Sequence, residues 1–261
     1  MRKFVILAMV AVASLMVASF AQADQTITAS INKSKLDKKK KTPVQLLVDI
    51  RTTDKGGDVD QPADADRTVV GFPKNLTFDP KAVPNCAGTE AQLQNTTTEA
   101  AIDVCGKKSV VSVGGPVTID SATRSVTSQT GALVVVDTNP NAPGSAQTFV
   151  PVQVTAMNGT ENNQLYLHSK ALTLPVTNVL VGKLVKGKAP YGKMLDVTIP
   201  QLLAGGIADF KTTVQAKDYI TAVCKSKKMP YSAVTTYSDA PQTSATFEGS
   251  CKQKKSKKKK K

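Results

Sequence analysis

The sequence contains no tryptophan, and aromatic residues make up only 5% of its 261 positions. Carbohydrate-binding modules generally stack sugar rings on aromatic side chains, so this composition disfavours that function. The hydrophobic fraction of 41% is nevertheless ordinary for a globular protein. A core must therefore be built from Val, Leu, Ile and Ala, and the abundance of Val and Thr favours strands over helices.

Recognisable catalytic motifs are also missing from the sequence. The only histidine is His168, so a Ser-His-Asp triad would have to use it, and no G-x-S-x-G elbow is present. Tyr166 and Lys170 alternate with His168, which predicts that it lies on a polar, exposed strand face. The glycine pairs at 114–115 and 205–206 lack the context of a phosphate-binding loop. Paired carboxylates would meet only in three dimensions, which leaves a secreted hydrolase as an alternative.

Four cysteines are present, but none forms a C-x-x-C motif. Zinc is therefore disfavoured, and we expect neither a metal nor a cofactor. Four cysteines allow three disulfide pairings. We expect the sequential one, Cys86 with Cys105 and Cys224 with Cys251, because each pair brackets a local excursion of the chain. In the chain-entropy model, loops of these lengths each contribute about 3 kcal/mol to stability.

The first 23 residues have the three parts of a secretory signal peptide. Arg2 and Lys3 form a charged start, residues 4–20 are apolar, and Ala21-Gln22-Ala23 is a small-x-small cleavage site. We expect cleavage before Asp24 rather than an uncleaved anchor, although the apolar segment approaches the roughly 20 residues that span a bilayer. No later segment is apolar enough for a membrane span. The protein is therefore predicted to be secreted or associated with the cell envelope.

The formal net charge is +14, and much of it lies at the C-terminus. Segment 252–261 holds eight lysines and no apolar residue, so we expect a disordered tail. Such a tail associates with polyanions through counterion release, and anionic envelope polymers, acidic lipid headgroups and extracellular nucleic acid are candidates. Sequence-specific nucleic-acid recognition is not expected, because aromatic residues are not interleaved with the lysines. The alternative is that the tail only keeps the protein soluble.

The predicted polyanion-binding residues are Lys252, Lys254, Lys255, Lys257, Lys258, Lys259, Lys260 and Lys261.

Strand patterns recur between the signal and the tail. The clearest is residues 44–50, where Val44, Leu46, Val48 and Ile50 alternate with other residues and predict a half-buried strand. Similar runs, separated by turn signals, give about ten to twelve strands, and no helical pattern exceeds two turns. The run Lys38 to Lys41 is read as a solvated turn between strands.

One polar loop, residues 52–67, contains Asp54, Asp58, Asp60, Asp64 and Asp66. Clustered carboxylates suit calcium, so a calcium site in segment 54–66 is an alternative. The spacing does not fit the twelve-residue calcium loop, and Pro62 stands where another ligand would fall. A solvated connecting loop is the preferred interpretation.

The central stretch, residues 68–115, organises the expected fold. A strand-like run leads to Cys86, a short segment from Glu90 to Asn95 favours a helix, and another apolar run follows Cys105. We predict an all-β fold, an antiparallel β-sandwich of the immunoglobulin-like or jelly-roll-like kind, with one short helical cap between Cys86 and Cys105. Residues 24–251 are expected to form one domain.

Several motifs in this chain resemble a group of exported, β-rich, functionally uncharacterised proteins of actinobacteria. They are segments 71–80 and 83–86, segment 105–114, Ala189-Pro190-Tyr191-Gly192, and the C-terminal Tyr219-to-Cys224 run with its hairpin ending at Cys251. In that group a proline often follows the second cysteine, and Gly106 departs from this pattern. The resemblance implies export, disulfides and a β-sandwich, and it implies no activity.

From the sequence we therefore expect an exported, non-enzymatic structural or interaction module, held near the anionic cell envelope by its lysine tail. A secreted hydrolase of unknown specificity and a soluble carrier with a ligand cavity between its sheets are the alternatives.

Overall fold

The structure is a computed structural model that describes residues 24–53, 62–112, 114–120, 122–137, 147–200, 205–238 and 240–254. Antiparallel strands dominate these ranges and helices are few, so the predicted all-β fold class is confirmed. The predicted signal peptide, residues 1–23, lies outside the described residues.

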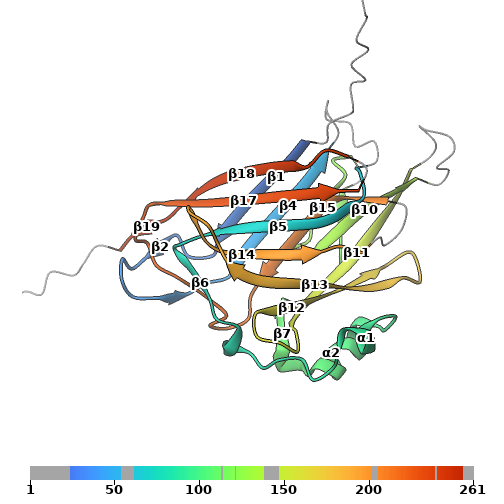
Figure 1. Cartoon of the computed structure of the whole chain (residues 1–261), viewed down its shortest axis with the longest axis horizontal. Helices are drawn as coiled ribbons and strands as arrows, with labels where there is room; N and C mark the ends of the chain where they lie inside the picture. Colours follow the sequence, from blue (N-terminus) through green and yellow to red (C-terminus); the bar gives the residue numbers. More distant parts are fainter. Residues whose placement is uncertain are drawn as a thin grey trace, which may run out of the picture.

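One large antiparallel sheet carries most of the structure (Figure 1). Along the sheet its strands are β1 (Asp24–Ile31), β4 (Leu46–Thr53), β15 (Gly205–Val214), β10 (Gly131–Asp137), β11 (Gln147–Asn158), β12 (Gln164–Ala171), β13 (Thr177–Lys186), β14 (Tyr191–Thr198), β5 (Ala65–Pro73), β17 (Lys228–Tyr237) and β18 (Thr243–Ser250). A twelfth strand, β7 (Val110–Ser112), pairs with β11. The run from β10 to β14 is a meander, because each of these strands pairs with the next one in the chain.

The sheet curls until its two ends meet. Its end strands β1 and β18 contact each other, and the Gln25 side-chain amide on β1 donates a hydrogen bond to Thr235 Oγ1 on β17 at 2.6 Å. The predicted sandwich is thus built from a single sheet, nearly closed and barrel-like, whose two sides face each other across one core.

The core follows from period-two alternation on each strand. On β4, Leu46, Val48 and Ile50 are buried while Leu47, Asp49 and Arg51 are only partly buried, as the sequence pattern predicted. The inner face is mostly aliphatic, and Phe72 and Phe78 form an aromatic contact within it, with ring centroids 4.8 Å apart.

The described residues also form three small sheets besides the large one. They are β3 (Thr42–Pro43) with β16 (Ile220–Ala222) and β6 (Leu76–Phe78), the parallel pair β2 (Lys35–Leu36) and β19 (Lys252–Gln253), and the hairpin β8 (Ile119–Asp120) with β9 (Ser125–Val126). The β9 strand of that hairpin contacts β10 and β15.

The helical elements are η1 (Pro80–Ala82), α1 (Glu90–Leu93), α2 (Thr98–Cys105) and η2 (Lys107–Ser109). Within the described ranges, no helix is both long enough and apolar enough to cross a membrane. The cap predicted between the first two cysteines is confirmed, and it contains α2 in addition to the expected helix at Glu90. Thr97 starts α2, because its side chain accepts a hydrogen bond from the Ala100 amide at 3.2 Å.

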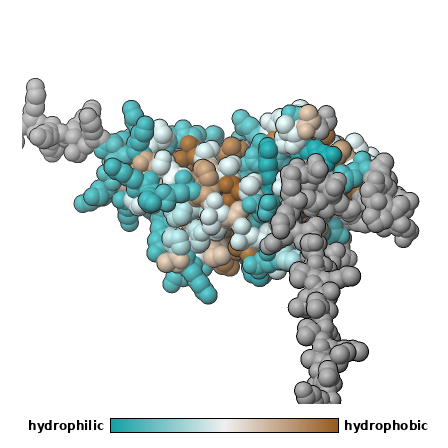
Figure 2. All heavy atoms as spheres, turned by 90° about the horizontal axis from the view of Figure 1, so that it is seen from above, coloured by the Kyte–Doolittle hydropathy of each residue, from teal (hydrophilic) through white to brown (hydrophobic). Residues whose placement is uncertain are grey.

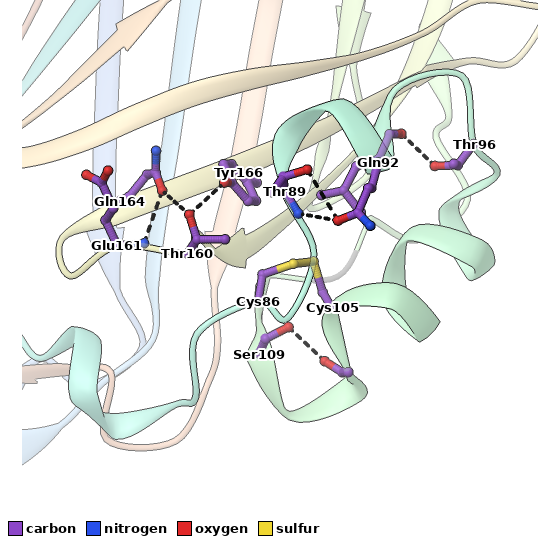
Figure 3. The surroundings of a disulfide bond; sticks show 12 residues. Cys86, Thr89, Gln92, Thr96, Cys105, Ser109, Thr160, Glu161, Gln164 and Tyr166 are labelled. Atoms are coloured by element: carbon purple, nitrogen blue, oxygen red, sulfur yellow. Dashed lines mark hydrogen bonds between the residues drawn. A yellow bond between two sulfur atoms is a disulfide. The ribbon is translucent and has the colours of Figure 1, made fainter.

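Both predicted disulfides are present, Cys86–Cys105 and Cys224–Cys251. Figure 3 shows the first one closing the cap, with α1 and α2 beside it. The cap packs Leu93 and Ala101 against Met157, Tyr166 and Val179 on the outer face of the sheet. Two disulfides indicate an oxidising, extracytoplasmic environment.

The first residues of the predicted disordered tail require a correction. Lys252 and Gln253 form β19, and the amides of Lys252 and Lys254 donate to Ser34 O and Leu36 O, both at 2.8 Å. The physical reason is the Cys224–Cys251 bond, which holds the chain beside β2 after the last strand of the large sheet. Residues 255–261 lie outside the described residues.

A test of this core compares two leucines. Leu46 is 0% exposed and Leu172 is 47% exposed. We expect Leu46→Ala to lower the free energy of unfolding by about 2–5 kcal/mol and Leu172→Ala to change it by less than about 0.5 kcal/mol, because only the first removes buried contacts. Denaturant unfolding with the disulfides intact measures both. Equal effects would contradict the proposed inner face.

Candidate functional site

Exposed lysines from three segments gather at the end of the molecule that carries β2 and β19. We call this surface the basic end. Its described lysines are Lys33, Lys35, Lys38, Lys39, Lys40, Lys41, Lys225, Lys227, Lys228, Lys252 and Lys254, all exposed. Figure 2 shows hydrophilic side chains crowding this end of the molecule.

Backbone hydrogen bonds hold the three segments together. The pairing of β2 with β19 joins the first segment to the last. The amide of Cys224 donates to Asp37 O at 2.8 Å, and the side-chain amide of Gln253 donates to Cys224 O at 2.9 Å. The Cys224–Cys251 disulfide adds a covalent link. The lysines thus share one surface because the fold fixes their backbones, not because their side chains attract each other.

Asp37 is the one acidic residue in segment 33–41. Its carboxylate accepts hydrogen bonds from the amides of Lys40 and Lys39, at 2.8 and 2.7 Å, and these bonds together with the nearby Lys254 lower its pKa. Asp37 therefore remains ionised and orders the turn. At the edge of the same surface, Lys228 forms an ion pair with Glu248 at 3.0 Å.

The sequence predicted only part of this surface. Lys252 and Lys254 lie on it, whereas Lys255 and Lys257 to Lys261 are outside the described residues. The run Lys38 to Lys41 does form an exposed turn, but that turn adjoins the start of the tail. The signal that points to this arrangement is the cysteine pairing, because Cys224 and Cys251 are each followed directly by lysine.

A second candidate is an apolar cavity of about 120 Å³ inside the curled sheet. Its aliphatic wall comes from inner-face residues such as Val48, Leu167, Leu184 and Val197. A cluster of polar side chains also lines the cavity, near the seam where the two ends of the sheet meet. We call it the polar cluster, and it consists of Gln25, Thr52, Thr68, Thr235 and Tyr237. Hydrogen bonds join Gln25 to Thr235 at 2.6 Å and Thr68 to Thr235 at 3.0 Å.

His168 is not on an exposed polar face, and that prediction was wrong. The side chain is 0% exposed, because α1 and α2 cover the outer face of the sheet there. The Thr96 hydroxyl donates to Leu93 O at 2.6 Å, so it accepts from His168 Nε2 at 3.2 Å. Loss of solvent around the ring lowers the pKa of His168, so the imidazole is neutral and acts as a packing residue.

A buried carboxyl also lies on the outer face, beneath the β8–β9 hairpin. Asp209 is 0% exposed, and its Oδ2 accepts from the Val126 amide at 2.7 Å. The Arg51 guanidinium is 3.7 Å from the same oxygen. Lys211 Nζ donates a hydrogen bond to Val126 O at 2.6 Å and forms an ion pair with Asp49 at 3.2 Å. Desolvation, assisted by the neighbouring Asp49, raises the pKa of Asp209 to about 7.

In the described ranges, no three His, Cys, Asp or Glu residues come together as a group that could hold a metal ion. Asp49 and Asp209 instead face the cations of Arg51 and Lys211. Of the aspartate-rich loop suggested for calcium, residues 54–61 lie outside the described part of the chain.

The Asp209 environment predicts a pH dependence of stability. The folded-state pKa is above the unfolded value of 3.8, so the folded state holds a proton that the unfolded state loses between about pH 4 and about pH 7. The stability that this group contributes is complete below about pH 4, falls between about pH 4 and about pH 7, and levels off above that range, with a total loss of up to about 4 kcal/mol. Asp209→Asn should remove that decline, as measured by denaturant unfolding across pH.

Asp196 offers a control of opposite sign. The Arg67 guanidinium donates to both its oxygens at 2.6 Å and lowers its pKa, so its stabilisation is lost on acidification. Asp196→Asn should leave the decline toward pH 7 unchanged. An equal decline in the wild type and Asp209→Asn would contradict the assignment.

The chain matches no protein-family model and none of the curated proteins. What the basic end and the cavity do is therefore inferred from the chemistry of their own residues.

Proposed function

We propose that the protein is an exported, non-enzymatic interaction module that binds anionic polymers of the cell envelope through its basic end and the adjoining lysine tail. The observation that carries this proposal is the convergence of exposed lysines from segments 33–41, 225–228 and 252–254 on one surface. The two disulfides support an extracytoplasmic location, and the signal-like residues 1–23 support export.

Counterion release supplies the physical mechanism. A linear polyanion condenses small cations, and a lysine surface that replaces them gains free energy as they return to bulk solution. Segments 33–41, 225–228 and 252–254 contain no aromatic residue, so stacking on nucleobases has no support. These segments also contain no arginine, so they cannot make bidentate contacts, and each lysine acts as a point charge. These features favour a polymer recognised by charge density rather than by sequence.

The buried side chains of His168 and Asp209 do not favour the hydrolase alternative. His168 is enclosed by the cap, and Asp209 is enclosed by the β8–β9 hairpin. A catalytic group has to reach a substrate, and these two side chains are 0% exposed.

The test uses the disulfide-bonded mature protein and poly(glycerol phosphate) as the anionic probe. The logarithm of the wild-type association constant should fall linearly with the logarithm of the salt concentration. The variant Lys39→Gln with Lys225→Gln removes two charges from different segments, so it should lower affinity about three- to tenfold and flatten the salt slope by roughly one to two. Fluorescence titration at several salt concentrations measures both quantities.

Lys107→Gln with Lys108→Gln is the matched control, because these lysines are exposed but belong to η2 in the cap. It changes the net charge by the same amount. Equal losses in the two double variants would mean that only net charge matters, and the proposed surface would then be wrong. Binding to double-stranded DNA that depends on the base sequence would also contradict the proposal, because recognition by charge density does not distinguish bases.

A further inference from the structure

The interior of the curled sheet has space that its own side chains do not fill. The main cavity, about 120 Å³, approaches the roughly 150 Å³ of an engineered apolar cavity that binds benzene. A molecule of about one ring therefore fits. The lining is almost wholly apolar, and none of the described residues that form it is charged. A charged ligand would lose its hydration without gaining an ionic partner, so the cavity suits a neutral molecule.

The polar cluster at the seam adds a hydrogen-bond acceptor that can orient a ligand. The Gln25 amide nitrogen donates to Thr235 Oγ1, but the other end of this amide, Oε1, is buried and has no hydrogen-bond partner among the described residues. A buried carbonyl oxygen without a donor is unfavourable, and native proteins usually supply one. Because Gln25 lines the cavity, a bound molecule is placed to supply that donor.

We propose that the cavity binds a small neutral molecule that is mostly apolar and carries one hydroxyl, of the size and chemistry of a phenol or a short alcohol. The hydroxyl donates to Gln25 Oε1, and the rest of the molecule lies against the aliphatic wall. This site is separate from the basic end, so its test does not depend on whether the protein binds polyanions.

The boundary with a neighbouring cavity limits the size of the ligand. A second cavity of about 50 Å³ lies in the same interior and shares Leu180, Ile207 and Phe210 with the first. Its lining is also mainly aliphatic, with Ser169 and Asn178 as polar members. Phe210 forms part of the boundary between the two spaces. Truncation of this ring should therefore admit a longer molecule.

The test compares phenol with toluene, two molecules of the same shape that differ by a hydroxyl in place of a methyl group. Calorimetric titration gives the dissociation constant of each for the wild type and for Gln25→Met, which keeps the length of the side chain but removes the acceptor. We expect the ratio of the toluene to the phenol dissociation constant to fall about tenfold in the variant, with toluene affinity little changed. Comparing this ratio between the wild type and the variant cancels the different hydration of the two probes.

Ala156→Leu tests the location of binding, because Ala156 lines the cavity and the added atoms enter it. It should weaken both probes at least tenfold, whereas Val185→Leu, at an exposed site, should not. Folding of each variant is checked by its thermal transition. Three results would each overturn the proposal: no binding of either probe up to its solubility, unchanged binding in Ala156→Leu, or an unchanged probe ratio in Gln25→Met.

Discussion

Burial of one apolar sheet face is the constraint on which the other features depend. Each long strand places aliphatic side chains on one side, so the sheet must curl until β1 meets β18. A closed sheet encloses more volume as strands are added, and small barrels of about eight strands are just filled by side chains. Here the described residues place eleven strands along the sheet path, and the chain has no tryptophan to fill the extra space. The internal cavities are a consequence of that mismatch.

The outer face of the sheet is not left to solvent everywhere. The disulfide-closed cap covers β12 and β13, and the β8–β9 hairpin covers β10 and β15. Strand positions that alternate outward are therefore buried in these two regions, which explains both His168 and Asp209. Each polar side chain retains at least one hydrogen bond, His168 to Thr96 and Asp209 to Val126, as buried polar groups require.

Local patterns were enough for part of this structure. Strict alternation identified β4, and cysteine spacing identified both disulfides, because each signal depends on residues close in sequence. The same alternation misplaced His168, since a period-two pattern says which face a residue occupies but not what covers that face. Helix α2 carries no strong periodic signal over its eight residues and depends on its packing under the Cys86–Cys105 bond. The basic end and the cavity depend on contacts between distant segments.

The arrangement of the lysines is hard to attribute to folding alone. Like charges repel, so bringing segments 33–41, 225–228 and 252–254 together opposes stability. Backbone pairing of β2 with β19 and the Cys224–Cys251 bond hold them in place. Salt weakens the repulsion between exposed charges, but it does not loosen a covalent bond. Because backbone pairing and a disulfide hold these lysines together, the surface keeps its shape when a polyanion displaces the small ions around it. A binding surface needs such a fixed shape, whereas a tail that only keeps the protein soluble does not.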